Sequence, residues 1–120
     1  MRRKTIYLVE DEPDISEMIQ YLLSSMGGEV SACLTAEMFW KQMKVKLPDL
    51  IILDIMLPDG NGADIGEQLA SDDATHDIPI LFMSANHSFK LPQQLSKNQF
   101  ISKPFDINVF SSKVESLLVS

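Results

Sequence analysis

Hydrophobic residues form two alternating patterns along this chain. Short, nearly continuous apolar runs, such as residues 6–9 and 50–53, are typical of strands buried on both faces of a sheet. Longer segments between them carry apolar residues at helical spacing. The patterns predict strands over residues 5–9, 29–34, 49–54, 78–83 and 99–101. They predict helices over residues 13–26, 36–45 and 62–70, and a last helix capped by Asp106.

The ends and inner faces of these helices can also be assigned. Asp11 or Glu12 can cap the first helix, Thr35 can cap the second, and the glycine pair at 27–28 would end the first. The spacing of apolar residues predicts which side chains of the first and last helices face the core. These are Ile15, Met18, Ile19, Leu22 and Leu23, and then Val109, Phe110, Val114, Leu117 and Leu118.

Strand–helix alternation repeated five times predicts an α/β fold with one doubly wound parallel sheet. We expect residues 1–120 to form a single domain, because the chain has the length of one domain and contains no linker-like tract. Residues 86–98 do not follow the strand–helix alternation, since Pro92 interrupts any long helix and the segment has too few apolar residues to form a core-facing side. We expect one short helical turn near residues 92–97, or an irregular loop.

Composition and charge exclude several classes of protein. The formal net charge of −7 argues against direct binding of nucleic acid through its phosphates. No apolar stretch approaches the roughly 20 residues that span a bilayer, so we expect no membrane segment. Cys33 is the single cysteine, which excludes an internal disulfide and fits a reducing cytoplasm.

Five polar residues follow the predicted strands and need a common explanation: Glu10, Asp11, Asp54, Ser84 and Lys103. Taken singly, each has an ordinary structural explanation as a helix-end charge, a turn residue or a loop residue. The carboxyl ends of parallel strands meet at one edge of a sheet, so these side chains are expected to converge. Their occurrence together favours one shared site.

The chemistry of this set points to a cation and a phosphoryl group. Carboxylate oxygens of Glu10, Asp11 and Asp54, with the backbone carbonyl of Met56, are hard ligands that suit Mg²⁺. The other oxygen of Asp54 would be free to attack phosphorus, giving an aspartyl phosphate. Lys103 and the metal would offset charge on the transferring group, and the Ser84 hydroxyl could donate to it.

Four segments of the sequence resemble the receiver domain of two-component response regulators. They are Leu-Val-Glu-Asp-Glu-Pro at 8–13, Asp-Leu-Ile-Ile-Leu-Asp-Ile-Met-Leu-Pro-Asp-Gly-Asn-Gly at 49–62, Ile-Leu-Phe-Met-Ser-Ala at 80–85, and Ser-Lys-Pro-Phe at 102–105. The similarity covers nearly the whole chain. It implies a flavodoxin-like, five-stranded parallel sheet of order 2-1-3-4-5 with helices on both faces.

The resemblance also implies a function. A sensor histidine kinase or a phosphotransfer protein would pass a phosphoryl group from its phosphohistidine to Asp54, with Mg²⁺ as cofactor. In the family the acidic pair holds the metal, the lysine forms an ion pair with the phosphoryl group, and a hydroxyl and an aromatic residue act as the switch. Here those roles fall on Glu10 with Asp11, on Lys103, and on Ser84 with Phe100. The chain would thus be a cytoplasmic signalling switch that acts on a downstream effector domain or protein. It would catalyse its own phosphorylation and dephosphorylation, but would not be a metabolic enzyme.

The sequence departs from the family pattern between Ser84 and Lys103, which are only 19 residues apart. The resemblance therefore implies a fourth helix that is short, shifted or absent, and it leaves the usual output face in doubt. This departure keeps open a pseudo-receiver, an interaction module without phosphotransfer. A phosphatase of the haloacid dehalogenase type is disfavoured, because Met56 stands where that chemistry needs an acid. A flavin-binding protein is disfavoured because the acids at 10–12 would repel phosphate.

Overall fold

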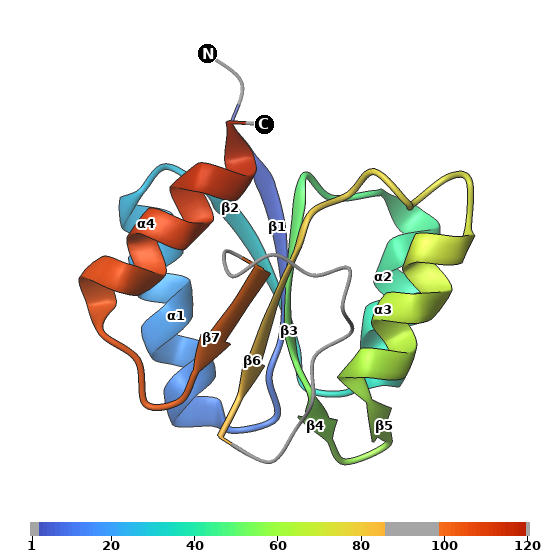
Figure 1. Cartoon of the computed structure of the whole chain (residues 1–120), viewed down its shortest axis with the longest axis horizontal. Helices are drawn as coiled ribbons and strands as arrows, with labels where there is room; N and C mark the ends of the chain where they lie inside the picture. The colour runs from blue at the N-terminus through green and yellow to red at the C-terminus, as the bar shows by residue number, and fades with distance from the viewer. Residues whose placement is uncertain (1–2, 86–98, 120) are drawn as a thin grey trace.

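In the part of the chain that the computed structural model describes, residues 3–85 and 99–119, five parallel strands form a sheet of order β2-β1-β3-β6-β7 (Figure 1). The strands are β1 (Thr5–Val9), β2 (Glu29–Cys33), β3 (Leu50–Asp54), β6 (Ile80–Ser84) and β7 (Phe100–Ser102). The order matches the predicted 2-1-3-4-5, because β6 and β7 are the fourth and fifth strands of this sheet. The α/β fold class and the doubly wound topology are confirmed.

Helices cover both faces of the sheet (Figure 1). On one side lie α1 (Pro13–Ser25) and α4 (Ile107–Leu118), and on the other lie α2 (Ala36–Val45) and α3 (Gly62–Ser71). Because strands β1, β3 and β6 are buried along their whole length, they require apolar side chains on both faces. The continuous hydrophobic runs in the sequence are the consequence of that burial.

The core consists of two apolar clusters, one on each face of the sheet. Alternate residues of β1 divide between them: Ile6 and Leu8 belong to the cluster under α1 and α4, while Tyr7 and Val9 belong to the one under α2 and α3. The helices complete the clusters with their buried residues, Ile19 and Leu23 of α1, Phe110 and Val114 of α4, Phe39 and Met43 of α2, and Ile65 and Leu69 of α3. Each fully buried side chain of this size contributes roughly 1.5–3 kcal/mol, so these layers hold the strand ends in place.

Several predicted boundaries move by one or two residues. The fourth strand of the sheet begins at Ile80, because the Ile78 N–H donates to the Thr75 carbonyl in the preceding turn. Two predicted core positions are wrong: Met18 of α1 is 42% exposed and Val109 of α4 is 47% exposed. In both helices, fewer positions face the sheet than the spacing of apolar residues predicts.

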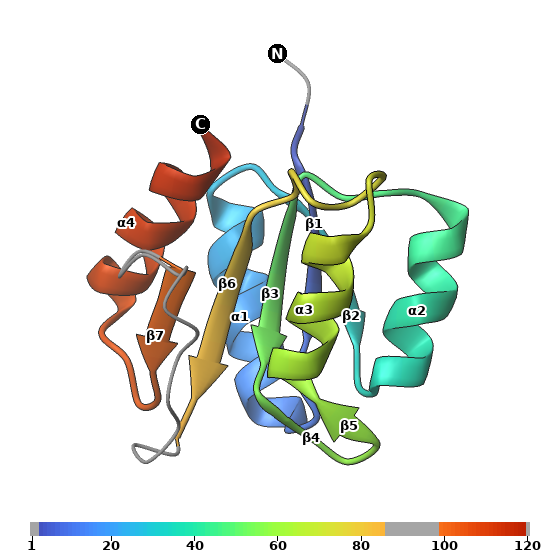
Figure 2. The same ribbon diagram turned by 45° about the vertical axis from the view of Figure 1, so that its right-hand side comes forward.

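A small hairpin that the sequence patterns did not predict follows β3. Strands β4 (Met56–Leu57) and β5 (Gly60–Asn61) pair antiparallel and lie beside the carboxyl end of β3 (Figure 2). Gly62 closes the hairpin, and a Cβ at this position would come within 2.3 Å of the Asp54 carbonyl oxygen. A glycine is therefore needed here because of the close approach of two backbone segments.

The predicted short turn or loop over residues 86–98 lies outside the described residues. Among residues 3–85 and 99–119, no helix has the length and apolar content needed to cross a membrane.

Candidate functional site

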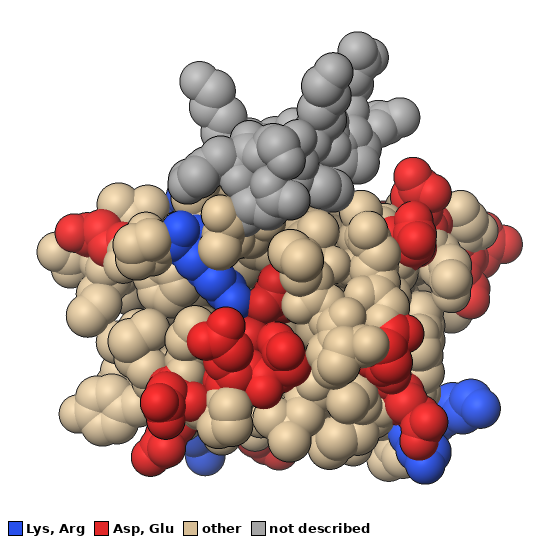
Figure 3. Space-filling model, turned by 90° about the horizontal axis from the view of Figure 1, so that it is seen from below, with Lys and Arg blue, Asp and Glu red and all other residues tan. Residues whose placement is uncertain are grey.

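The carboxyl ends of the strands meet at one edge of the sheet (Figure 2). Asp54 ends β3, Ser84 ends β6, Glu10 follows β1, and Lys103 follows β7. Val9 is paired with Leu53, and Asp54 with Met83, so the parallel register brings these residues to similar levels. Seen from this end, acidic side chains gather at the centre of the molecule beside a basic one (Figure 3).

Three carboxylates form a compact cluster at this edge. Glu10, Asp11 and Asp54 each offer one oxygen, and these oxygens lie within 4.8 Å of one another. Glu10 is fully buried and Asp54 is 5% exposed, while Asp11 is exposed to solvent. The predicted convergence of the acids is confirmed. Hard oxygen donors at this spacing fit a small divalent cation such as Mg²⁺.

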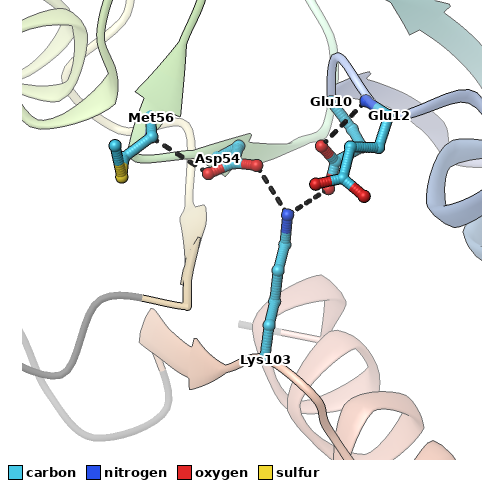
Figure 4. Close-up of polar contacts among 5 residues, drawn as sticks. All are labelled: Glu10, Glu12, Asp54, Met56 and Lys103. Atoms are coloured by element: carbon cyan, nitrogen blue, oxygen red, sulfur yellow. Dashed lines mark hydrogen bonds and ion pairs between the residues drawn. The ribbon is translucent and has the colours of Figure 1, made fainter.

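Lys103 reaches between two of these acids (Figure 4). Its Nζ lies 2.6 Å from Asp54 Oδ2 and also forms an ion pair with Glu10 Oε1. The Lys103 backbone N–H donates to the Ser84 carbonyl at 3.0 Å, which fastens the lysine to the end of β6. An ammonium group thus already occupies a position against two carboxylates, so the site accommodates positive charge.

Burial perturbs the protonation of two site residues. The pKa of Glu10 is raised from its ordinary 4.5 to about 7, chiefly because burial removes water from the carboxylate; the hydrogen bond from Lys103 opposes this shift, and the nearby Asp54 adds to it. Desolvation alone would lower the pKa of Lys103. The hydrogen bonds to Asp54 and Glu10 outweigh that effect and raise it, so the lysine stays charged. The charge of Glu10 therefore changes near neutral pH.

The Asp54 carboxylate is more fully bonded than the sequence indicated. Oδ1 accepts the Met56 N–H at 3.0 Å, and Oδ2 accepts from Lys103. Both oxygens of Asp54 thus have hydrogen-bond partners, and the expectation that one of them attacks phosphorus stays a prediction. Each carboxylate oxygen has two acceptor positions, so both can still meet an incoming electrophile or a cation.

Ser84 and Phe100 occupy neighbouring strands. Ser84 is buried at the end of β6 and follows Met83, the residue that is paired with Asp54. Phe100 of β7 is paired with Phe82 and packs, half-buried, on the cluster beneath α2 and α3. Ser84 thus lies at the acidic edge, whereas Phe100 lies at the start of β7, and the part of both in a switch stays a prediction. The same holds for the Met56 carbonyl as a metal ligand.

Three contacts at this site leave no recognisable signal in the sequence pattern. The Glu12 N–H donates to Glu10 Oε2 at 3.2 Å, which orients the buried carboxylate. Gly62 permits the hairpin to close on the Asp54 backbone. The Asp59 carboxylate at the hairpin turn accepts two N–H groups from α2. The Pro-Asp-Gly triplet at 58–60 is typical of a turn, but a turn motif does not reveal which distant helix it contacts.

The family model and the similar proteins of known sequence agree on one family. The family model of the response regulator receiver domain matches residues 6–115. The chain is 36% identical over 117 residues to the transcriptional regulatory protein CssR of Bacillus subtilis, covering 95% of this chain and 51% of that protein. It is 35% identical over 121 residues to the phosphate regulon transcriptional regulatory protein PhoB of Pseudomonas aeruginosa, covering 96% and 52%.

A solved structure has a similar fold. The crystal structure of a sensor protein from Polaromonas sp. JS666 matches with a TM-score of 0.86 and 25% identity, covering 98% of each chain. The chain spans about half the length of the two curated relatives.

Proposed function

Given that the chain belongs to the receiver domain family of response regulators, we propose that residues 1–120 form one receiver domain that accepts a phosphoryl group on Asp54. The donor would be the phosphohistidine of a sensor histidine kinase or of a phosphotransfer protein. Phosphorylation would change how the domain binds a downstream effector domain or protein, in the cytoplasm. The observation that carries the proposal is the placement of Lys103 against Asp54 and Glu10 at the carboxyl edge of the sheet.

In the proposed reaction an Asp54 carboxylate oxygen attacks phosphorus. A new O–P bond forms as the P–N bond to the donor imidazole breaks, and the imidazole nitrogen keeps the electron pair and takes up a proton. Lys103 would move from the carboxylate to an oxygen of the arriving phosphoryl group, keeping its charge where negative charge accumulates. Ser84, at the adjacent strand end, would donate its hydroxyl to the same group.

The donor set of the site fits Mg²⁺. Glu10, Asp11, Asp54 and the Met56 backbone carbonyl would hold the ion. When bound, it would supply positive charge against the oxygens of the transferring phosphoryl group. Burial of Glu10 and Asp54 keeps two of these carboxylates fixed by the sheet, whereas the exposed Asp11 leaves one side open to solvent and donor.

The proposal is tested by incubating the purified chain with a small acyl phosphate and Mg²⁺, followed by intact-mass measurement. We expect the mass of one added phosphoryl group in the wild type and none in Asp54→Asn. Omitting Mg²⁺, or adding a chelator, should abolish the gain.

Asp64→Asn is the matched control, because it makes the same chemical change at an exposed aspartate in the first turn of α3. This variant should be phosphorylated like the wild type. No mass gain in the wild type, or an equal gain in Asp54→Asn, would contradict the proposal and support an interaction module without phosphotransfer.

A further inference from the structure

The hairpin beside the site is bonded to the start of helix α2. Asp59 Oδ1 accepts the Ala36 N–H at 2.8 Å, and Oδ2 accepts the Glu37 N–H at 3.0 Å. These partners lie more than twenty residues away in the sequence, so the contact depends on tertiary structure. At the same place a Cβ on Gly60 would lie 3.7 Å from the Ala36 Cβ, an ordinary packing distance.

This contact completes the cap of α2. The first-turn N–H groups of a helix lack partners within the helix. Thr35 satisfies Met38 through its own hydroxyl at 3.2 Å, whereas Ala36 and Glu37 are satisfied by Asp59. These two backbone hydrogen bonds lower the pKa of Asp59 because they favour its charged form, and the carboxylate also interacts favourably with the helix dipole.

The inner end of the same hairpin is bonded to the proposed phosphoacceptor. The Met56 N–H donates to Asp54 Oδ1 at 3.0 Å, and the Gly62 N–H donates to the Ile55 carbonyl at 2.7 Å. Leu57 packs on the cluster beneath α2 and α3. The hairpin is therefore attached at one end to Asp54 and at its turn to α2.

We propose that Asp59 is a positioning residue that, by holding the hairpin turn on the start of α2, keeps the Met56 backbone in place beside Asp54. The consequence for metal and phosphoryl binding rests on the function proposed above. The positioning itself does not, because it concerns contacts within the protein alone.

The size of the effect follows from a two-state argument. If the Asp59 contact favours the hairpin position in which the Met56 N–H bonds to Asp54, its loss populates other positions of the hairpin. The apparent affinity for a ligand of the site then falls in proportion to the fraction of molecules that keep this position. A helix cap of ordinary strength corresponds to about a fivefold to tenfold change in such an equilibrium.

The test compares the wild type with Asp59→Ala, Asp59→Asn and the control Asp73→Asn, which removes one charge from an exposed site in the α3–β6 connection. The first measurement is amide hydrogen exchange by NMR without metal or phosphodonor. The Ile51 amide, which donates to the Pro79 carbonyl within the sheet, serves as reference for global opening.

In Asp59→Ala we expect the Ala36, Glu37 and Met56 amides to exchange at least about fivefold faster relative to Ile51. Asp59→Asn keeps one acceptor oxygen and should give an intermediate increase, and it decides the question if the alanine variant does not fold. Asp73→Asn should match the wild type. Faster exchange at Ala36 and Glu37 with Met56 unchanged would overturn the proposal and leave Asp59 as a helix cap only.

The second measurement is the Mg²⁺ dependence of phosphorylation by an acyl phosphate. Asp59→Ala should raise the half-saturating Mg²⁺ concentration, by up to about fivefold, while leaving the rate at saturating Mg²⁺ within about twofold of the wild type. An unchanged half-saturating concentration in the variant would contradict the proposal. If the wild type itself is not phosphorylated, the proposed function fails, and the exchange measurement still decides the role of Asp59.

Discussion

Replacing Lys103 by methionine should destabilise the metal-free protein by an amount that depends on pH. The variant keeps an unbranched side chain of similar length and removes the ammonium group. Glu10 and Asp54, whose side chains are 0% and 7% exposed, would then lie close together without their counter-ion. Removing one partner of a buried ion pair costs about 3–5 kcal/mol when the remaining charge stays ionised.

Glu10 can reduce this cost by binding a proton. Its pKa in the folded wild type is about 7, and Lys103 is one of the influences that lower it, so the variant should hold the proton to higher pH. An acid with a raised folded pKa contributes stability below its unfolded pKa of 4.5 and loses it as the pH rises through the folded value. The wild type has lost most of that contribution by about pH 7 and loses little more above it, whereas the variant, which still holds the proton in the folded state, goes on losing stability as the pH rises. The cost of the substitution therefore grows by about 1.4 kcal/mol between about pH 6 and pH 8.

The assay is urea unfolding of wild type and Lys103→Met at the two ends of this pH range, in the presence of a chelator. The difference in unfolding free energy should be larger at the alkaline end. Lys41→Met is the control, because Lys41 pairs with Glu37 at 3.4 Å on the surface, where both side chains are about three-quarters exposed. That pair should contribute less than about 1 kcal/mol at either pH. A Lys103→Met cost that does not change with pH, or is larger at the acidic end, would refute the reasoning about Glu10.

Three further predictions concern close packing and the metal. Gly62→Ala should lower the unfolding free energy by about 1–3 kcal/mol in urea titrations, because its Cβ would lie 2.3 Å from a backbone oxygen, whereas Gly60→Ala should stay within about 1 kcal/mol of the wild type. Gly66→Ala should destabilise because its Cβ would lie 2.5 Å from the Phe82 ring, and adding Phe82→Leu should recover part of the loss, so strict additivity in this double-mutant cycle would contradict the contact. Mg²⁺ should raise the melting temperature of the wild type more than that of Asp11→Asn, while the two metal-free proteins should melt alike because Asp11 is exposed; equal shifts would exclude Asp11 as a ligand.

The sheet and its order could be predicted because the relevant information is local and repeated. Strands buried on both faces need continuous apolar runs, and β1 and β3 show them at almost the predicted bounds. Thr35 and Asp106 were predicted as caps and do accept N–H groups from the first turns of α2 and α4. Each of these features depends on residues within a few positions of one another.

The contacts that could not be predicted join segments that are far apart. The hairpin at 56–61 is too short to show a strand pattern, and its bond from Asp59 to α2 depends on how two loops meet. The same limit applies to the Lys103 bond to Glu10, although parallel-sheet geometry did place both at one edge. Burial of individual helix residues also depends on the tilt of each helix, which explains why Met18 and Val109 were assigned to the wrong side.

The charges of the site can be balanced only in the folded chain. Glu10 is fully buried, and a lone carboxylate in that position would be costly. Its counter-ion is Lys103, 93 residues later, and that lysine is held in place by its backbone bond to the end of β6. Pairing of β7 with β6 is thus what supplies the cation to the acids of β1 and β3. Docking of the last strand therefore completes the site, and a substitution that loosens β7 should disturb Asp54 even though it lies outside the acidic cluster.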